Sequence, residues 1–253
     1  MNTPQEFSPL LAGLRSLPHA SGAALATLTR TSGSTFRRAG ARMLIYGDGR
    51  IVRGLSAGCP EQDIVARAQE AICTNEARIL RYDREHSFDT LMEMGCGGEL
   101  DVLIEPLREA SDWRFAELVN DILQARRSGV LATLFSRDGI CLPRPLRWLW
   151  SNTPLLDEID EPHVRAQLSE LAPALPAGHK PTVRAYTTDR GIAEVLVEQL
   201  LPPCAALLFG VNASSVALAG VLMQLGWTVT LIDHRDHCPE RLPAEMRWRH
   251  CTP

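Results

Sequence analysis

The sequence predicts an α/β protein, with a mixed α/β region over residues 1–198 followed by a truncated βαβ unit over residues 199–253. Two observations lead to this prediction. Short apolar runs bounded by Gly turns, which are typical of strands, alternate with stretches whose apolar residues recur at helical spacing. Towards the C-terminus an apolar run, a Gly turn, a helical pattern and a second apolar run follow one another, which is the order of a parallel βαβ unit.

Composition and charge exclude several classes of protein. Of the 253 residues, 45% are apolar and 22% are charged, so the chain is neither disordered nor a coiled coil. The net charge of −4 argues against a general nucleic-acid binder, which would usually be basic. Residues 1–10 lack a basic start followed by an apolar core, and the seven Cys are unevenly spaced. We therefore expect no export signal and reduced thiols in a cytoplasmic protein.

One long uncharged segment raises the question of a membrane helix. Residues 199–232 contain no charged side chain, and this length would be enough to span a bilayer. Pro202, Pro203 and Gly210 interrupt the segment, and such breaks are typical of a strand, a turn and a helix in succession. We therefore expect no membrane helix.

The elements of the first region follow from the spacing of its apolar residues. Apolar periodicity predicts helices over residues 8–16, 60–73 and 112–127. Apolar runs predict strands over residues 23–30, 42–46, 51–54, 78–82, 100–105, 130–135 and 182–187. Residues 142–181 are rich in Pro and acidic residues and predict loops, a solvated face and a helix near residues 163–171. No internal repeat is visible in the sequence.

Three local signals refine these elements. Asp-Gly steps at residues 48–49 and 138–139 predict hairpin turns, because both residues tolerate the turn conformation. Pro106 is expected to stop the strand that precedes it. Asp112 is expected to be the N-cap of the helix that follows, because its carboxylate can accept from free backbone N–H groups.

The order of elements near the C-terminus is that of a dinucleotide-binding, Rossmann-like βαβ unit. A strand over residues 205–209 leads into Gly210, and a second strand ends at Asp233, which stands where the ribose-binding acid is found. Asn212 and Ser215 replace the second and third Gly of the fingerprint, and a Cβ at the second position tends to block the pyrophosphate. We therefore expect the fold but not NAD binding.

The same unit predicts self-association. The pattern has room for two parallel strands, and a two-stranded unit is not stable alone. It must therefore pack on the rest of the chain or on a second copy, and we expect a homodimer because unpaired strand edges invite pairing.

Two Gly turns that carry Cys are the candidates for chemistry. Cys59 follows Gly58, and Cys96 lies between Gly95 and the pair Gly97-Gly98. Gly allows positive φ and exposes backbone N–H groups, and successive N–H groups form an anion-binding nest that lowers the pKa of a thiol. Cys96, with three Gly neighbours that pack nothing, is the strongest candidate.

The remaining Cys and His residues predict less. Cys73 and Cys204 are expected to be small buried apolar residues. The chain has no Cys-x-x-Cys pair, and the cluster of His234, His237 and Cys238 lies in a tail loop, so zinc is not favoured.

A polar turn between two expected strands could bind an anion. Residues 32–42 carry Ser34 together with Arg37, Arg38 and Arg42. Arg side chains in a Ser/Gly turn suit a phosphate, and the alternative is an ordinary solvated loop.

These motifs together resemble the XdhC/CoxI family, accessory proteins that mature the molybdenum cofactor of xanthine dehydrogenase and related hydroxylases. The most specific run is Met94–Pro106, which contains Cys96. The similarity covers most of the chain in the same order, and it also rests on residues 33–37, 40–43, 58–61, 81–83 and 225–235.

The resemblance implies a chaperone and not a turnover enzyme. Family members bind the molybdenum–pterin cofactor, hold it while a cysteine desulfurase supplies the terminal sulfido ligand, and pass it to the apo-hydroxylase. It implies that Cys96 is the main contact to the cofactor and contacts the molybdenum, and that Cys59 is the second contact. It also implies that Arg37 or Arg38 binds the phosphate of the pterin. The other expected site residues are Gly95, Gly97, Gly98, Ser34 and Glu61.

Two departures and two alternatives stay open. The family's Rossmann domain continues with further strands, and Ala213 stands where many relatives carry a His. One alternative function is an NAD(P)-binding oxidoreductase, which the frame from Gly210 to Asp233 suggests. The other is an adaptor between desulfurase and hydroxylase that has no cofactor pocket.

Overall fold

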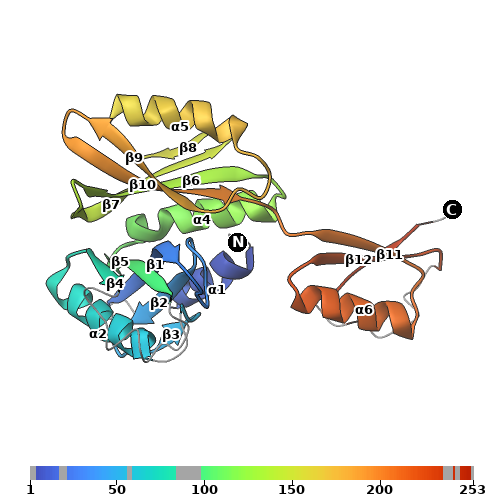
Figure 1. Ribbon diagram of the computed structural model, residues 1–253. Helices are drawn as coiled ribbons and strands as arrows, with labels where there is room; N and C mark the ends of the chain where they lie inside the picture. Colours follow the sequence, from blue (N-terminus) through green and yellow to red (C-terminus); the bar gives the residue numbers. More distant parts are fainter. Residues whose placement is uncertain are drawn as a thin grey trace. The chain divides into compact units, whose positions relative to one another are not determined.

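The computed structural model describes residues 4–16, 22–55, 59–83, 98–235, 242 and 246–251. The chain forms two compact units, Met1–Leu201 and Pro202–Pro253. The predicted α/β class is confirmed, because helices and three sheets make up the described residues (Figure 1).

The described residues of the first half of the larger unit form one five-stranded sheet with two helices. The sheet order is β3-β2-β1-β5-β4, and neighbouring strands are antiparallel. The elements, in chain order, are α1 (Pro4–Arg15), β1 (Ala23–Ser32), β2 (Arg42–Tyr46), β3 (Ile51–Val52), α2 (Cys59–Thr74), β4 (Arg78–Tyr82) and β5 (Glu99–Leu107).

The second half repeats this arrangement. Its sheet order is β8-β7-β6-β10-β9, which matches the first sheet strand for strand. The elements are α4 (Ala110–Gln124), β6 (Gly129–Arg137), β7 (Ile140–Ser151), β8 (Thr153–Asp157), α5 (Pro162–Ala174), β9 (Thr182–Thr188) and β10 (Gly191–Leu200). We call residues 4–107 the first repeat and residues 110–200 the second repeat.

The repetition extends to the register of the strands. Thr27 lies opposite Arg42 in the first repeat, and Thr133 lies opposite Arg147 in the second. The central strand of each sheet also has an irregularity at the equivalent position. Where β1 pairs with β5, one residue between Leu28 and Arg30 has no partner, and where β6 pairs with β10, the residue before Ser136 has none. The expectation of no internal repeat is therefore wrong for the fold, although the sequence does not reveal the repetition.

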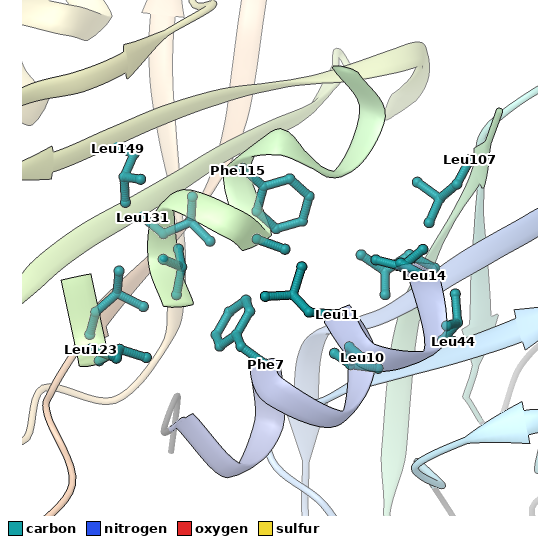
Figure 2. Packing of buried hydrophobic residues seen from close by; sticks show 14 of the residues in the cluster. Phe7, Leu10, Leu11, Leu14, Leu44, Leu107, Phe115, Leu123, Leu131 and Leu149 are labelled. Atoms are coloured by element: carbon teal, nitrogen blue, oxygen red, sulfur yellow. The ribbon is translucent and has the colours of Figure 1, made fainter. Parts of the chain in front are cut away.

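The two repeats share one apolar core. Figure 2 shows Phe7, Leu11 and other residues of α1 packed near Phe115, Leu123, Leu131 and Leu149. This core also includes apolar side chains of β1, β2, β5 and β10, so α1 and α4 contact the inner faces of both sheets. The outer face of the first sheet is covered by α2 and that of the second by α5, which gives each sheet two apolar faces (Figure 1).

Most predicted elements of this unit are confirmed, but three local expectations are wrong. The strand over β5 does not stop at Pro106: it continues to Leu107, and β4 pairs with β5 only as far as Ile104. Pro106 therefore has no ladder bond to lose on that side. The N-cap of α4 is Glu109, and Asp112 is the third helical residue, whose Oδ2 accepts from the Glu109 N–H at 3.2 Å.

The third wrong expectation concerns residues 142–181, which were expected to be mainly loops. The strand β7 runs on through Pro143 and Pro145, where β8 has not yet joined the sheet, so both Pro lie on an open edge. The helix expected near residues 163–171 is confirmed as part of α5.

The smaller unit is a parallel βαβ arrangement with one strand more than expected. The order is β11-β12-β13, and α6 packs on one face of this sheet (Figure 1). Its elements are β11 (Ala205–Phe209), α6 (Ala213–Gln224), β12 (Thr228–Asp233) and β13 (Arg247–His250). The prediction of only two strands is wrong, because β13 adds a third beside β12. Among the described residues, no helix is long and apolar enough to cross a membrane.

Candidate functional site

The connections that carry the predicted site residues leave from one end of the first sheet. Ser32 at the end of β1 lies opposite Glu99 at the start of β5, and Tyr82 at the end of β4 lies opposite Leu100. Because β2 starts and β3 ends at this side, the connections 33–41, 53–58 and 83–98 all begin and end here. We call this end of the sheet, with its three connections, the loop edge.

Gly98 and the Ser34-Thr35 turn are in direct contact at the loop edge. A Cβ on Gly98 would lie 2.1 Å from the Ser34 carbonyl oxygen and 2.6 Å from Thr35 Cγ2. No side chain fits there unless the backbone moves, so Gly is required by close packing. The structure thereby brings together two segments that were predicted to form the site from separate parts of the sequence.

Arg37 and Glu61 hold the connection between β3 and α2 from two sides. Arg37 Nη1 donates to the Gly54 carbonyl at 3.0 Å, and Glu61 Oε2 accepts from the Leu55 N–H at 3.1 Å. Arg38, in contrast, is exposed. Arg37 and Glu61 therefore shape the loop edge, whereas Arg38 can reach an anion in solvent.

The two predicted thiols are only partly described. Cys59 is the first residue of α2, and Pro60 follows it in the first helical turn, where a missing N–H costs nothing. The start of α2 also places the positive end of a helix dipole at the loop edge. The side chain of Cys59 and all of Gly95, Cys96 and Gly97 lie outside the described residues, so their contacts stay predictions.

A tyrosine beside the loop edge was absent from the predicted site. Tyr82 is 3% exposed, and its hydroxyl donates to Asp63 Oδ2 at 2.8 Å. Burial, and then the bond to Asp63, raise the pKa of Tyr82 far above its usual value, so it stays protonated. It lines a shallow pocket of about 300 Å³ with Arg67, Arg78 and Arg81. The run Arg81-Tyr82-Asp83 was the only sequence signal for it.

The second repeat closes the corresponding end of its sheet. Its strands β6 and β7 are joined by the two residues 138–139, and β9 and β10 by residues 189–190, where the first repeat has the sixteen residues 83–98. Ion pairs cross this end, with Arg137 bound to Glu161 and Arg190 bound to Asp160. The same scaffold therefore carries long connections in one repeat and compact, ion-paired turns in the other.

A set of ion pairs joins the loop edge of the first sheet to the corresponding end of the second sheet. Arg30 of β1 pairs with Asp101 at 3.3 Å and with Glu194 of β10 at 2.6 Å, and the Ser136 hydroxyl also donates to Glu194. Burial alone would raise the pKa of Glu194, but the hydrogen bonds from Ser136 and Arg30 outweigh it and lower that pKa. The loop edge is thus tied to the second repeat.

In the smaller unit, the positions that correspond to a nucleotide-binding fingerprint make hydrogen bonds within the unit itself. Asp233 Oδ2 accepts from the Val211 N–H at 2.7 Å, and both carboxylate oxygens accept from Arg235. Arg235, and then the backbone N–H of Val211, hold the pKa of Asp233 far below its usual range. Asn212 Oδ1 accepts from the first N–H groups of α6, those of Ser214 and Ser215, at 3.0 Å each. A ribose and a pyrophosphate would have to displace these bonds.

The other Cys residues differ from expectation. Cys73 and Cys204 are exposed, not buried, because Cys73 lies on the outer side of the last turn of α2 and Cys204 precedes β11. Cys141 is partly buried, and burial raises its pKa to about 12. Within the described ranges there is no group of three His, Cys, Asp or Glu placed to hold a metal; His237 and Cys238 lie outside those ranges.

Comparison with known proteins finds the same family that the motifs suggest. Residues 19–83, which span β1 to β4, match the model of the XdhC and CoxI family. The chain is 26% identical over 225 residues to a probable xanthine dehydrogenase subunit of Bacillus subtilis, covering 87% of this chain and 62% of that protein. It is 29% identical over 131 residues to the molybdenum cofactor insertion chaperone PaoD of Escherichia coli, covering 51% and 40%.

A solved structure supports the fold. The crystal structure of a xanthine dehydrogenase from Bacillus halodurans matches with a TM-score of 0.71 at 22% identity, over 93% of this chain and 64% of that one. The chain thus spans less than two thirds of the length of each of these relatives. The resemblance to the family is confirmed.

Proposed function

We propose that this chain, which carries the XdhC and CoxI family segment at residues 19–83, is an accessory protein that binds the molybdenum cofactor at the loop edge and delivers it to a xanthine dehydrogenase-type hydroxylase. The name of the relative PaoD supports a role in cofactor insertion, and the name of the Bacillus subtilis relative supports an association with xanthine dehydrogenase. The observation that carries the proposal is the convergence of three Gly-rich connections at one end of the first sheet, while the matching end of the second is closed.

The residues at the loop edge have the donor chemistry that such a cargo needs. A thiolate at Cys96 would be a soft ligand for molybdenum, and Cys59 at the start of α2 would be a second one. Arg38, which is exposed, and the N–H groups at the helix start would meet the phosphate of the pterin. Arg37 is bound to the Gly54 carbonyl, so its role would be to hold the loop in place.

The partners follow from the same proposal. A cysteine desulfurase would supply the sulfido ligand while the cofactor is held, and the apo-hydroxylase would then receive it. The smaller unit would serve self-association, because Leu207 and Phe209 of its edge strand β11 are 58% and 75% exposed. An oxidoreductase role fits less well, because Arg235 and Asn212 already bind the groups that a dinucleotide would need.

Cofactor loading tests the proposal directly. The full chain is purified from cells replete in molybdenum cofactor, and bound molybdenum and pterin are measured for the wild type, Cys96→Ala and Cys73→Ala. Cys73 is the matched control, since it is an exposed thiol at the opposite end of α2, about 20 Å along the helix. We expect the wild type and Cys73→Ala to retain cofactor and Cys96→Ala to lose it. A wild type without cofactor, or full retention by Cys96→Ala, would refute the proposal.

A further inference from the structure

Two buried ion pairs connect the repeats in a reciprocal way. Arg42 of the first repeat binds Glu198 of the second, with Nη2–Oε2 and Nη1–Oε1 distances of 2.5 and 3.0 Å, and the side chains are 1% and 0% exposed. Arg147 of the second repeat binds Glu105 of the first, with Nη2 at 2.6 Å from both carboxylate oxygens. Each Arg also lies over a Phe ring, Phe7 at 5.0 Å and Phe115 at 4.6 Å.

The residues of the two pairs occupy equivalent positions. Glu105 lies opposite Leu25, and Glu198 lies opposite Leu131, which is the corresponding residue of β6. The Arg of each repeat thus binds the equivalent Glu of the other repeat. Such a reciprocal contact is the pattern of a two-fold symmetric dimer interface. The two pairs therefore occupy equivalent positions, and each can serve as a control for the other, although Arg42 binds through Nη1 and Nη2 and Arg147 through Nη2 alone.

One contact breaks this equivalence. Arg42 Nη1 also donates to the carbonyl of Gly40 at 2.9 Å, and Gly40, with a φ of 85°, is the last residue but one of the connection 33–41. Arg147 Nη1 is buried and has no hydrogen-bond partner among the described residues. In the second repeat the nine residues before Arg147 form a tight turn and the continuation of β7, so no separate loop reaches that side chain.

We propose that Glu198, although it lies in the second repeat, is a positioning residue for the loop edge. It orients the Arg42 guanidinium, and Arg42 in turn holds the Gly40 carbonyl. This contact adds to the backbone hydrogen bonds of Gly40 and Ala41 with Leu28 in fixing where the connection carrying Ser34 and Arg37 returns to the sheet. Glu105 and Arg147 have the same chemistry, and their side chains are 9% and 5% exposed, but they hold no such connection. The effect on cofactor binding rests on the proposed function, whereas the effect on loop order does not.

Paired variants of the full chain test this inference. Glu198→Gln and Glu105→Gln each remove one buried charge and keep the side-chain shape, and we expect both to lower the melting temperature by a similar amount. Amide hydrogen exchange of residues 33–41 should accelerate about tenfold in Glu198→Gln, as expected for the loss of one charge-assisted hydrogen bond, and should stay unchanged in Glu105→Gln. Cofactor retention should fall in the first variant only.

The outcomes separate the inference from the proposed function. Equal exchange of residues 33–41 in the two variants would overturn the positioning role, whatever binds. A wild type that carries no cofactor, together with faster exchange in Glu198→Gln alone, would uphold the positioning role and refute the proposed cargo. If Glu198→Gln fails to fold, Arg42→Lys and Arg147→Lys replace the pair, because an ammonium keeps the charge but lacks the fork that reaches both Glu198 and Gly40.

Discussion

The two repeats of the larger unit have the same strands in the same order, yet the connections at one end of the sheet are long in the first repeat and short in the second. The first repeat joins β4 to β5 through sixteen residues and the second joins β9 to β10 through two. Their cores and buried ion pairs correspond, so the scaffold does not distinguish them. Under the proposed function, the ability to bind a ligand would reside in the connections, and the sheet would serve to hold their ends in place.

The strongest test of the equivalence is to remove one carboxylate from each buried pair. Glu105→Ala and Glu198→Ala should each lower the free energy of unfolding by about 3–5 kcal/mol, because a buried guanidinium is left without its partner. Urea unfolding measures both values. A loss from only one of the two variants would show that the pairs are not the same interaction.

A smaller effect should come from Gly98→Ala. The new Cβ would meet the Ser34 carbonyl oxygen at 2.1 Å, so the two segments must separate, at a cost of about 1–3 kcal/mol. The control is Gly139→Ala in the second repeat, where a Cβ meets nothing within 4 Å and only the positive φ of 77° is strained, at about 1–2 kcal/mol.

Stability and cofactor retention should therefore separate in this pair of glycine variants. Both should be modestly less stable in urea, but only Gly98→Ala should lose bound molybdenum and pterin, because only Gly98 lies at the loop edge. Equal retention by the two variants would argue that the contact between Gly98 and Ser34 is not part of the site.

The smallest effect is expected at the bridge between the repeats. The lowered pKa of Glu194 means that its stabilising contribution is present above its unfolded value, near 4.5, and is lost as the pH falls through the lower folded value. Glu194→Gln should therefore cost about 1 kcal/mol at neutral pH, as for a partly exposed pair, and nothing at strongly acidic pH. Unfolding free energies of both proteins from pH 7 to pH 3 measure this, and a difference that grows on acidification would contradict it.

Local patterns were enough to predict most individual elements. The strand over residues 78–82 and the hairpin of β2 and β3 were predicted from apolar runs and the Asp-Gly turn, since these depend on neighbouring residues alone. The errors at Pro106, Asp112 and Cys73 have a common cause. Each depends on which strand, N–H group or solvent lies beside the residue, and that neighbour is not adjacent in the sequence.

The site was predictable in part for the same reason. Gly98, Ser34, Arg37 and Glu61 stand out as residues in polar, Gly-rich turns, and Tyr82 does not, because a tyrosine in a strand is ordinary. The sequence also does not separate Arg37 from Arg38, since only the fold shows that Arg37 is bound to a carbonyl and Arg38 is exposed.

The sequence by itself determined the α/β class, the helices and strands, the family resemblance and the turns in which chemistry is expected, because these depend on local spacing and residue type. Only the tertiary structure revealed that the larger unit is built from two copies of one arrangement and that three distant connections meet at one end of the first. The pairing of Arg42 with Glu198 gives the physical reason. The two residues are 156 positions apart in the sequence, and the pair matters for stability because the fold buries both charges together.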